Sequence, residues 1–78
     1  MSNVVAVIGL GYVGLPLACL CASKGYQTVG FDLNEYVISK LSNGQCHIRD
    51  EEVEKLLDQA IKSENFLPTL EPSKLNFA

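Results

Sequence analysis

Residues 4–14, VVAVIGLGYVG, decide the fold of this chain, because they join an apolar β-branched run to a GxGxxG glycine pattern. The run Val4–Ile8 has no polar alternation, which predicts a central parallel strand that is covered on both faces. Gly9–Gly14 is then expected to form a turn, and residues 12–24 a helix, with Gly25 at its C′ position. This order of strand, glycine turn and helix is typical of the first unit of a dinucleotide-binding fold.

The rest of the chain continues the alternation of strands and helices. The expected order is β-α-β-α-α-β, and Pro68 restricts the last strand to an edge or a strand start. The sequence therefore predicts an α/β fold, a Rossmann-type parallel sheet with flanking helices. The sheet is expected to be incomplete, because residues 1–78 cover only the first half of a dinucleotide-binding domain. The further elements are a strand at 27–32, helices at 34–42 and 50–64, a strand at 67–70 and a helix entry at 72–73.

Length and composition limit the kinds of protein this chain can be. With 78 residues there is room for one small domain at most. A hydrophobic share of 47% and a charged share of 19% are ordinary for a folded chain. The net charge of −3 has the wrong sign for binding nucleic acid or an anionic membrane. Cys19, Cys21 and Cys46 form no CxxC or Cys/His cluster, so neither a disulfide scaffold nor a metal site is expected.

The apolar stretch 4–22 has the length of a membrane span or a signal peptide. No basic region precedes it, and Gly9, Gly11, Gly14 and Pro16 interrupt its middle. A buried strand followed by a helix explains these residues, whereas a membrane span gains nothing from them. We therefore expect a cytoplasmic protein without a membrane segment.

Each position of the glycine pattern has a physical task in binding a dinucleotide. Gly9 permits the tight turn from strand to helix, and Gly11 lets the backbone approach a pyrophosphate without a Cβ clash. Gly14 lets the helix pack close to the strand. The free N–H groups near Tyr12 and Val13 then face the phosphates from the positive end of the helix dipole.

Asp32 ends the second predicted strand, where an acid can accept hydrogen bonds from the adenosine ribose hydroxyls. Its carboxylate would repel a 2′-phosphate, and no Arg or Lys lies between Gly25 and Ser39 to offset this charge. NAD is therefore favoured over NADP. Two alternatives stay open: the glycines only turn the chain while Asp32 caps the following helix, or the same unit binds FAD in a flavoprotein.

The adjacent residues Cys46 and His47 are the other candidates for chemistry, in a loop with Arg49 and Asp50 nearby. A nucleophilic Cys/His pair needs side chains that face each other, which sequence neighbours rarely do. A role in loop structure or in contact with a substrate is therefore favoured over catalysis. We assign no catalytic residue within the chain.

The string GLGYVGLP at 9–16 is much more specific than GxGxxG, and with it the chain resembles the UDP-glucose/GDP-mannose dehydrogenase family of nucleotide-sugar 6-dehydrogenases. Gly30-Phe31-Asp32 and the string LSNG at 41–44 reinforce the resemblance. The UDP-glucose branch usually has Pro-Ile-x-Glu followed by Pro-Gly where this chain has HIRD at 47–50 followed by two glutamates. At these positions the chain is more similar to the branch that acts on UDP-N-acetylhexosamines, notably UDP-N-acetylmannosamine.

The resemblance implies a reaction that this segment cannot perform by itself. Family members have several hundred residues and oxidise the C6 alcohol of a UDP-sugar to a uronate in two hydride transfers to NAD, through a covalent adduct on a cysteine. That cysteine lies beyond residue 78, and none of the three cysteines here matches it. The resemblance also implies a homo-oligomer in the cytoplasm that serves polysaccharide biosynthesis. The cofactor-binding residues that carry over are Gly9, Gly11, Tyr12, Val13, Gly14 and Asp32.

Two other functions are compatible with the residues. One is another NAD-dependent dehydrogenase, of the 3-hydroxyacyl or 6-phosphogluconate type, although those types lack the GYVGLP continuation. The other is a non-enzymatic NAD-sensing Rossmann module attached to an effector domain. Residues beyond 78 would discriminate among these functions.

Overall fold

The computed structural model describes residues 4–75. Its element order confirms the predicted alternation of strands and helices, followed by one short 3-10 helix. The Asn34 side chain caps α2 by accepting hydrogen bonds from two backbone N–H groups of its first turn, and Asp50 caps α3 in the same way. The elements are β1 (Val4–Ile8), α1 (Gly14–Ser23), β2 (Gln27–Phe31), α2 (Glu35–Ser42), α3 (Glu51–Ser63), β3 (Phe66–Thr69) and η1 (Pro72–Leu75).

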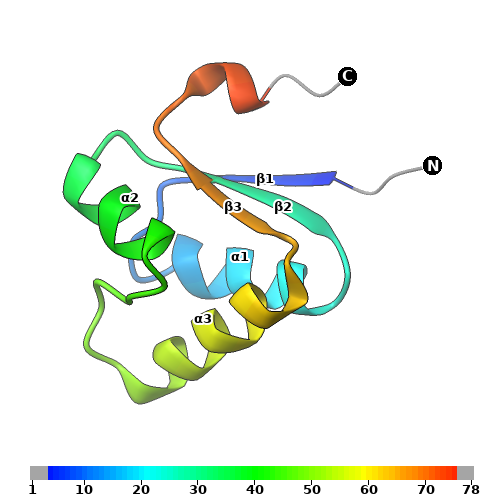
Figure 1. Cartoon of the computed structure of the whole chain (residues 1–78), viewed down its shortest axis with the longest axis vertical. Helices are drawn as coiled ribbons and strands as arrows, with labels where there is room; N and C mark the ends of the chain where they lie inside the picture. Colours follow the sequence, from blue (N-terminus) through cyan, green and yellow to red (C-terminus); the bar gives the residue numbers. More distant parts are fainter. Residues whose placement is uncertain (1–3, 76–78) are drawn as a thin grey trace.

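The three strands form one parallel sheet in the order β1-β2-β3. In the register of the sheet, Val7 lies beside Gly30 and Gly30 beside Pro68. Figure 1 shows α1, α2 and α3 on one side of the sheet and η1 beyond its other side. The Rossmann-type α/β class is thereby confirmed, and β3 with its Pro68 is an edge strand of the described sheet, as predicted.

The hydrophobic core lies between the sheet and the three helices. Small residues of α1 let α3 pack closely against it, because Ala18, Cys19 and Ala22 are all fully buried. Gly30 leaves room over the middle strand, since a Cβ there would lie 2.8 Å from the Phe66 ring and 3.0 Å from the Leu10 side chain. The acidic side chains of α3 point to solvent, on the face opposite its buried residues Val53, Leu57 and Ala60.

One expectation about β1 is wrong. Within residues 4–75 it is an edge strand covered mainly on its helix side: Val7 is buried, whereas Ile8 is 72% exposed. The reason is topological, because all three helices cover the same face and β1 pairs only with β2. The middle position belongs to β2, whose last four residues are buried.

The helix expected at residues 12–24 begins at Gly14 and ends at Ser23. The preceding residues form a turn in which the Gly11 carbonyl accepts the Leu15 N–H at 3.0 Å, so helical hydrogen bonding starts just before the helix proper. Gly25 has a φ of 101°, in the left-handed region that its predicted C′ position requires. No helix among residues 4–75 combines the length and the apolar character needed to cross a membrane.

Candidate functional site

The turn between β1 and α1 places a tight backbone corner at the carboxyl end of the sheet. Gly9 has a φ of 91°, which favours glycine, and its N–H donates to the Phe31 carbonyl at 2.8 Å. A Cβ on Gly14 would overlap the Gly9 carbonyl oxygen and lie 2.9 Å from the Gly9 carbonyl carbon. The close approach of α1 to β1 therefore requires a glycine at position 14.

Three backbone donors at this corner are free. None of the hydrogen bonds among residues 4–75 uses the N–H groups of Gly11, Tyr12 or Val13. They stand at the start of α1, a ten-residue helix whose positive dipole end adds to their attraction for an anion. A Cβ built on Gly11 meets no atom within 4 Å, so the space beside the loop is open. The corner can therefore receive a phosphate group.

Asp32 follows β2 directly and is bonded to the glycine turn. Its Oδ2 accepts the Leu10 N–H at 2.9 Å, and its Oδ1 accepts the Asn34 N–H at 2.9 Å. These backbone hydrogen bonds, the one from Leu10 first, hold the pKa of the Asp32 carboxyl below its ordinary value. Each carboxylate oxygen keeps a lone pair for a further donor. Asn34, not Asp32, caps the following helix, so the capping role considered for Asp32 is wrong.

A cavity of about 210 Å³ lies where β1 and β2 end. Its lining is apolar except for the Asp32 carboxylate, and two of its side chains, Ile8 and Leu33, are largely exposed. Parallel α/β sheets bind ligands at the carboxyl ends of their strands. An apolar hollow with one carboxylate suits a nucleoside, whose base is flat and whose ribose carries hydroxyl donors. The lining residues are Ile8, Gly9, Phe31, Asp32 and Leu33.

The structure brings all six predicted site residues to this one end of the sheet. The glycine turn supplies five of them, and the bond from Leu10 N–H to the carboxylate ties Asp32 to that turn. The six residues are Gly9, Gly11, Tyr12, Val13, Gly14 and Asp32.

Sequence reasoning missed a second set of contacts to the same turn. His47 Nε2 lies 2.7 Å from the Leu10 carbonyl oxygen, and the Tyr12 hydroxyl donates to Asp50 Oδ2 at 3.2 Å. The hydrogen bond to Asp50 raises the pKa of the Tyr12 hydroxyl above its ordinary value. The single signal in the sequence is the Cys46-His47 pair, for which a role in loop structure or in contact with a substrate is predicted, and the structure shows that His47 contacts the glycine turn.

Within residues 4–75 none of the three cysteines forms a disulfide. Cys19 is fully buried on α1, and burial raises the pKa of its thiol to about 12, so it stays protonated and unreactive. Cys21 and Cys46 are half-buried. Among residues 4–75 no group of three His, Cys, Asp or Glu side chains is placed to hold a metal ion.

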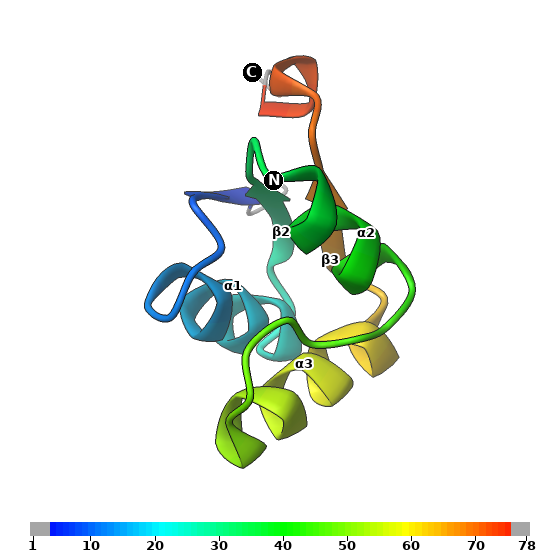
Figure 2. The same ribbon diagram turned by 90° about the vertical axis from the view of Figure 1, so that its left-hand side faces the viewer.

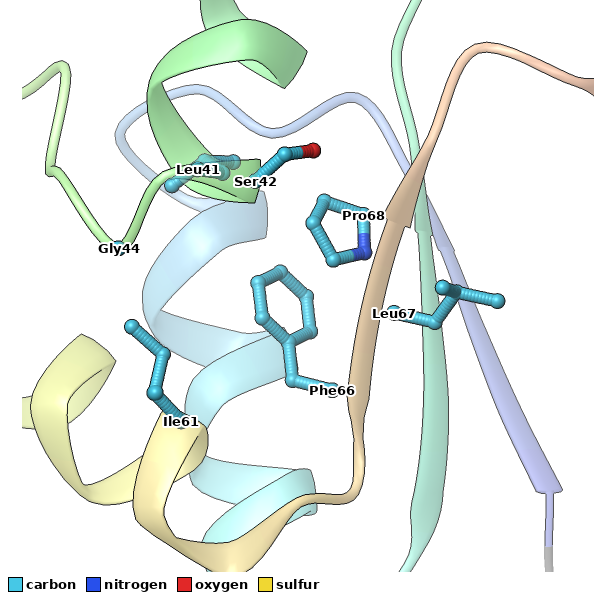
Figure 3. Close-up of a pocket in the computed structure, with 7 residues that line it drawn as sticks. All are labelled: Leu41, Ser42, Gly44, Ile61, Phe66, Leu67 and Pro68. Atoms are coloured by element: carbon cyan, nitrogen blue, oxygen red, sulfur yellow. The ribbon is translucent and has the colours of Figure 1, made fainter.

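A second cavity, of about 320 Å³, lies beside β3 and away from the glycine turn. In Figure 3 the Phe66 and Pro68 side chains face Leu41, Ser42 and Ile61, whereas Leu67 lies on the other side of the strand. The lining carries no charged side chain, so it offers no group for acid–base or anion chemistry. The glycine turn and Asp32 therefore form the better candidate site.

Comparison with known proteins finds a matching family model and curated relatives. Residues 3–76 match the model of the UDP-glucose/GDP-mannose dehydrogenase family, NAD binding domain. A curated relative, the UDP-N-acetyl-D-mannosamine dehydrogenase of Pyrococcus horikoshii, is 44% identical over 57 residues, which are 73% of this chain and 14% of that protein.

Two solved structures share the fold at significant sequence identity. A UDP-D-ManNAc dehydrogenase from Pyrococcus horikoshii superposes with a TM-score of 0.85 at 38% identity, over 92% of this chain and 17% of that one. A UDP-glucose dehydrogenase from Pyrobaculum islandicum gives a TM-score of 0.85 at 30% identity, over 95% of this chain and 17% of that one. The chain thus spans less than a fifth of the proteins it matches. Since the family model covers nearly all of its residues, the chain belongs to the UDP-glucose/GDP-mannose dehydrogenase family, within its NAD-binding domain.

Proposed function

We propose that this chain is the N-terminal part of an NAD-dependent nucleotide-sugar 6-dehydrogenase, which oxidises the C6 alcohol of a UDP-sugar to a uronate in two hydride transfers. The observation that carries the proposal is the pairing of three free N–H groups on the glycine turn with a carboxylate bonded to that turn. The N–H groups are suited to a pyrophosphate and the carboxylate is suited to a ribose diol, and these are adjacent parts of NAD.

The proposed contacts follow from the geometry of the turn. The N–H groups of Gly11, Tyr12 and Val13 bind the pyrophosphate, and the open space beside Gly11 admits it. Asp32 accepts the ribose hydroxyls, and its lowered pKa keeps it ionised near neutral pH, where it repels a 2′-phosphate. The site thus favours NAD over NADP.

NAD, when bound, supplies the hydride acceptor of the reaction. This chain contributes binding and orientation, since its strand ends and glycine turn hold the adenosine and pyrophosphate half of the cofactor. The groups that handle the sugar alcohol belong to the part of the enzyme beyond these residues. Gly9 and Gly14 shape the turn, because Gly9 has a positive φ and Gly14 leaves room for the Gly9 carbonyl.

We propose a UDP-N-acetylhexosamine, with UDP-N-acetylmannosamine first, as the substrate. Relatives named UDP-N-acetyl-D-mannosamine dehydrogenase support it, from Pyrococcus horikoshii at 44% identity and from Methanococcus maripaludis at 43%. UDP-glucose is the second candidate, because a UDP-glucose dehydrogenase shares the fold at 30% identity. A cytoplasmic homo-oligomer that serves polysaccharide biosynthesis is the setting that the family resemblance implies.

The test is turnover by the full-length enzyme that carries these residues. It should reduce about two NAD per UDP-N-acetylmannosamine, since an alcohol passes through an aldehyde to a carboxylate, and should use UDP-glucose and NADP poorly. The readout is NADH absorbance together with identification of the uronate. Oxidation of a hydroxyacyl or phosphogluconate substrate, with no reaction on any UDP-sugar, would overturn the proposal.

A further inference from the structure

The backbone at Leu10 is held from two sides by side chains that are distant in sequence. Its N–H donates to Asp32 Oδ2 at 2.9 Å, and its carbonyl oxygen lies 2.7 Å from His47 Nε2. A carbonyl can only accept, so Nε2 carries the proton and donates it. The Leu10 side chain is fully buried in the core, and this packing restrains the residue in addition to the two hydrogen bonds.

The carbonyl that His47 holds belongs to the same peptide plane as the Gly11 N–H. In a trans peptide the C=O and the following N–H point in opposite directions. No peptide bond among the described residues is cis. With the Leu10 oxygen directed at His47, the Gly11 N–H is directed away from His47. This N–H is one of the three free donors of the turn.

Within residues 4–75 no other hydrogen bond is made to the Leu10 carbonyl or to the Gly11 N–H, the two polar groups of that peptide plane. Gly11 has no side chain, and a Cβ built on it meets no atom within 4 Å. Glycine also rotates more freely than any other residue, so without a restraint the plane samples orientations that do not suit a phosphate. Binding would then have to order the plane at the expense of affinity.

His47 itself is well anchored for this task. The next residue, Ile48, is buried in the hydrophobic core, and Asp50 both caps α3 and accepts the Tyr12 hydroxyl. Figure 2 shows the loop between α2 and α3 passing in front of α1 and α3. His47 Nδ1 is buried and has no hydrogen-bond partner among residues 4–75, so the Leu10 carbonyl is the partner that orients the ring.

We propose that His47 is a positioning residue for the dinucleotide: its hydrogen bond to the Leu10 carbonyl presets the Gly11 N–H for the pyrophosphate. The inference rests on the proposed function for the identity of the ligand, NAD. It adds a residue that does not touch the ligand and that lies in the loop after α2, outside the glycine pattern.

The experiment compares two replacements of His47 in the full-length enzyme. His47→Gln keeps an N–H donor at a similar distance from the backbone, whereas His47→Met has a similar size and no donor. His47→Met should weaken NAD binding about tenfold, the effect of losing one hydrogen bond to a preset loop, and His47→Gln should stay within about threefold of the wild type. Isothermal calorimetry with NAD alone measures the affinity, and steady-state kinetics should show the loss in KM for NAD rather than in kcat.

Gln45→Ala is the matched control, because Gln45 lies in the same loop, is exposed, and its side chain makes no hydrogen bond within residues 4–75. It should bind NAD as the wild type does. Thermal unfolding checks that each variant folds, and if His47→Met does not, His47→Ala replaces it in the comparison. Wild-type affinity in the variant without a donor, or an equal loss in His47→Gln, would overturn the role of His47. A wild type that binds no NAD would instead overturn the proposed function.

Discussion

At the scale of single residues, the proposed function gives Asp32 the largest share in the choice of cofactor. It is fixed by two backbone N–H groups and directed to the cavity where β1 and β2 end. Asp32→Ala should weaken NAD binding by about 1–3 kcal/mol, the range for hydrogen bonds to a charged group. NADP binding should weaken much less, because the variant also loses the repulsion of the 2′-phosphate. Calorimetry with both dinucleotides measures this, and unchanged NAD affinity would show that the ribose lies elsewhere.

Asp32 also predicts how stability depends on pH. Its folded-state pKa is lowered below the ordinary value of about 3.9, so its contribution to stability is complete above about pH 4. As the pH falls through the lowered folded-state pKa, that contribution is lost. Asp32→Asn cannot titrate, so its unfolding free energy should fall less steeply on acidification, as measured by urea unfolding between about pH 3 and 7. An identical acid slope in both proteins would contradict the stabilising role of the carboxylate.

At the scale of elements, substitutions of two glycines of the same motif should have different effects, one on stability and the other on NAD binding. Gly14→Ala places a methyl group against the Gly9 carbonyl, so α1 must move off β1, at a cost of about 1–3 kcal/mol or more. Gly11→Ala meets open space and has no left-handed φ, so the fold should keep its stability. It should nevertheless lose at least about tenfold in NAD affinity, because the methyl group would occupy the place proposed for the pyrophosphate.

Thermal unfolding and NAD titration of the same two variants separate these effects. The prediction fails for Gly14 if the Gly14→Ala variant unfolds at the same temperature as the wild type. It fails for Gly11 if the variant binds NAD normally, because the phosphates would then have to approach from another side of the turn.

The elements themselves were largely predictable, because their signals are local. The apolar run and the glycine spacing each depend on residues within one turn or strand. Boundaries moved by one or two residues, as at the start of α1, since Gly11 and its neighbours begin helical bonding before they adopt helical geometry.

Two features could not be predicted because they depend on distant parts of the chain. Whether Ile8 is covered depends on which side of the sheet the helices occupy, and an apolar run does not contain that information. The contact of His47 with the Leu10 carbonyl joins two loops far apart in sequence, and no periodicity connects them.

At the scale of the whole molecule, the described sheet has a one-sided distribution of helices. The three helices cover one face, and η1 packs against β2 on the other. Ile8 and Leu67 stay 72% and 47% exposed, and the outer edge of β1 has no strand beside it within residues 4–75. Monomeric proteins rarely leave an apolar sheet face and a strand edge open together. We therefore infer that further chain covers this face in the full-length enzyme.

The last prediction follows from that incompleteness: residues 1–78 alone should have no dehydrogenase activity. In the proposed function the segment binds one end of a dinucleotide, whereas the nicotinamide ring needs the second half of the fold. Cys19 is fully buried and the pKa of its thiol is raised to about 12, so it is unfit as a nucleophile. The purified segment with NAD and UDP-sugars should give no NADH absorbance, while the full-length enzyme under the same conditions does. It should also self-associate as its concentration rises in sedimentation runs, because its open sheet edge can pair with another copy. Measurable turnover by the segment would show that residues 1–78 contain a complete active site.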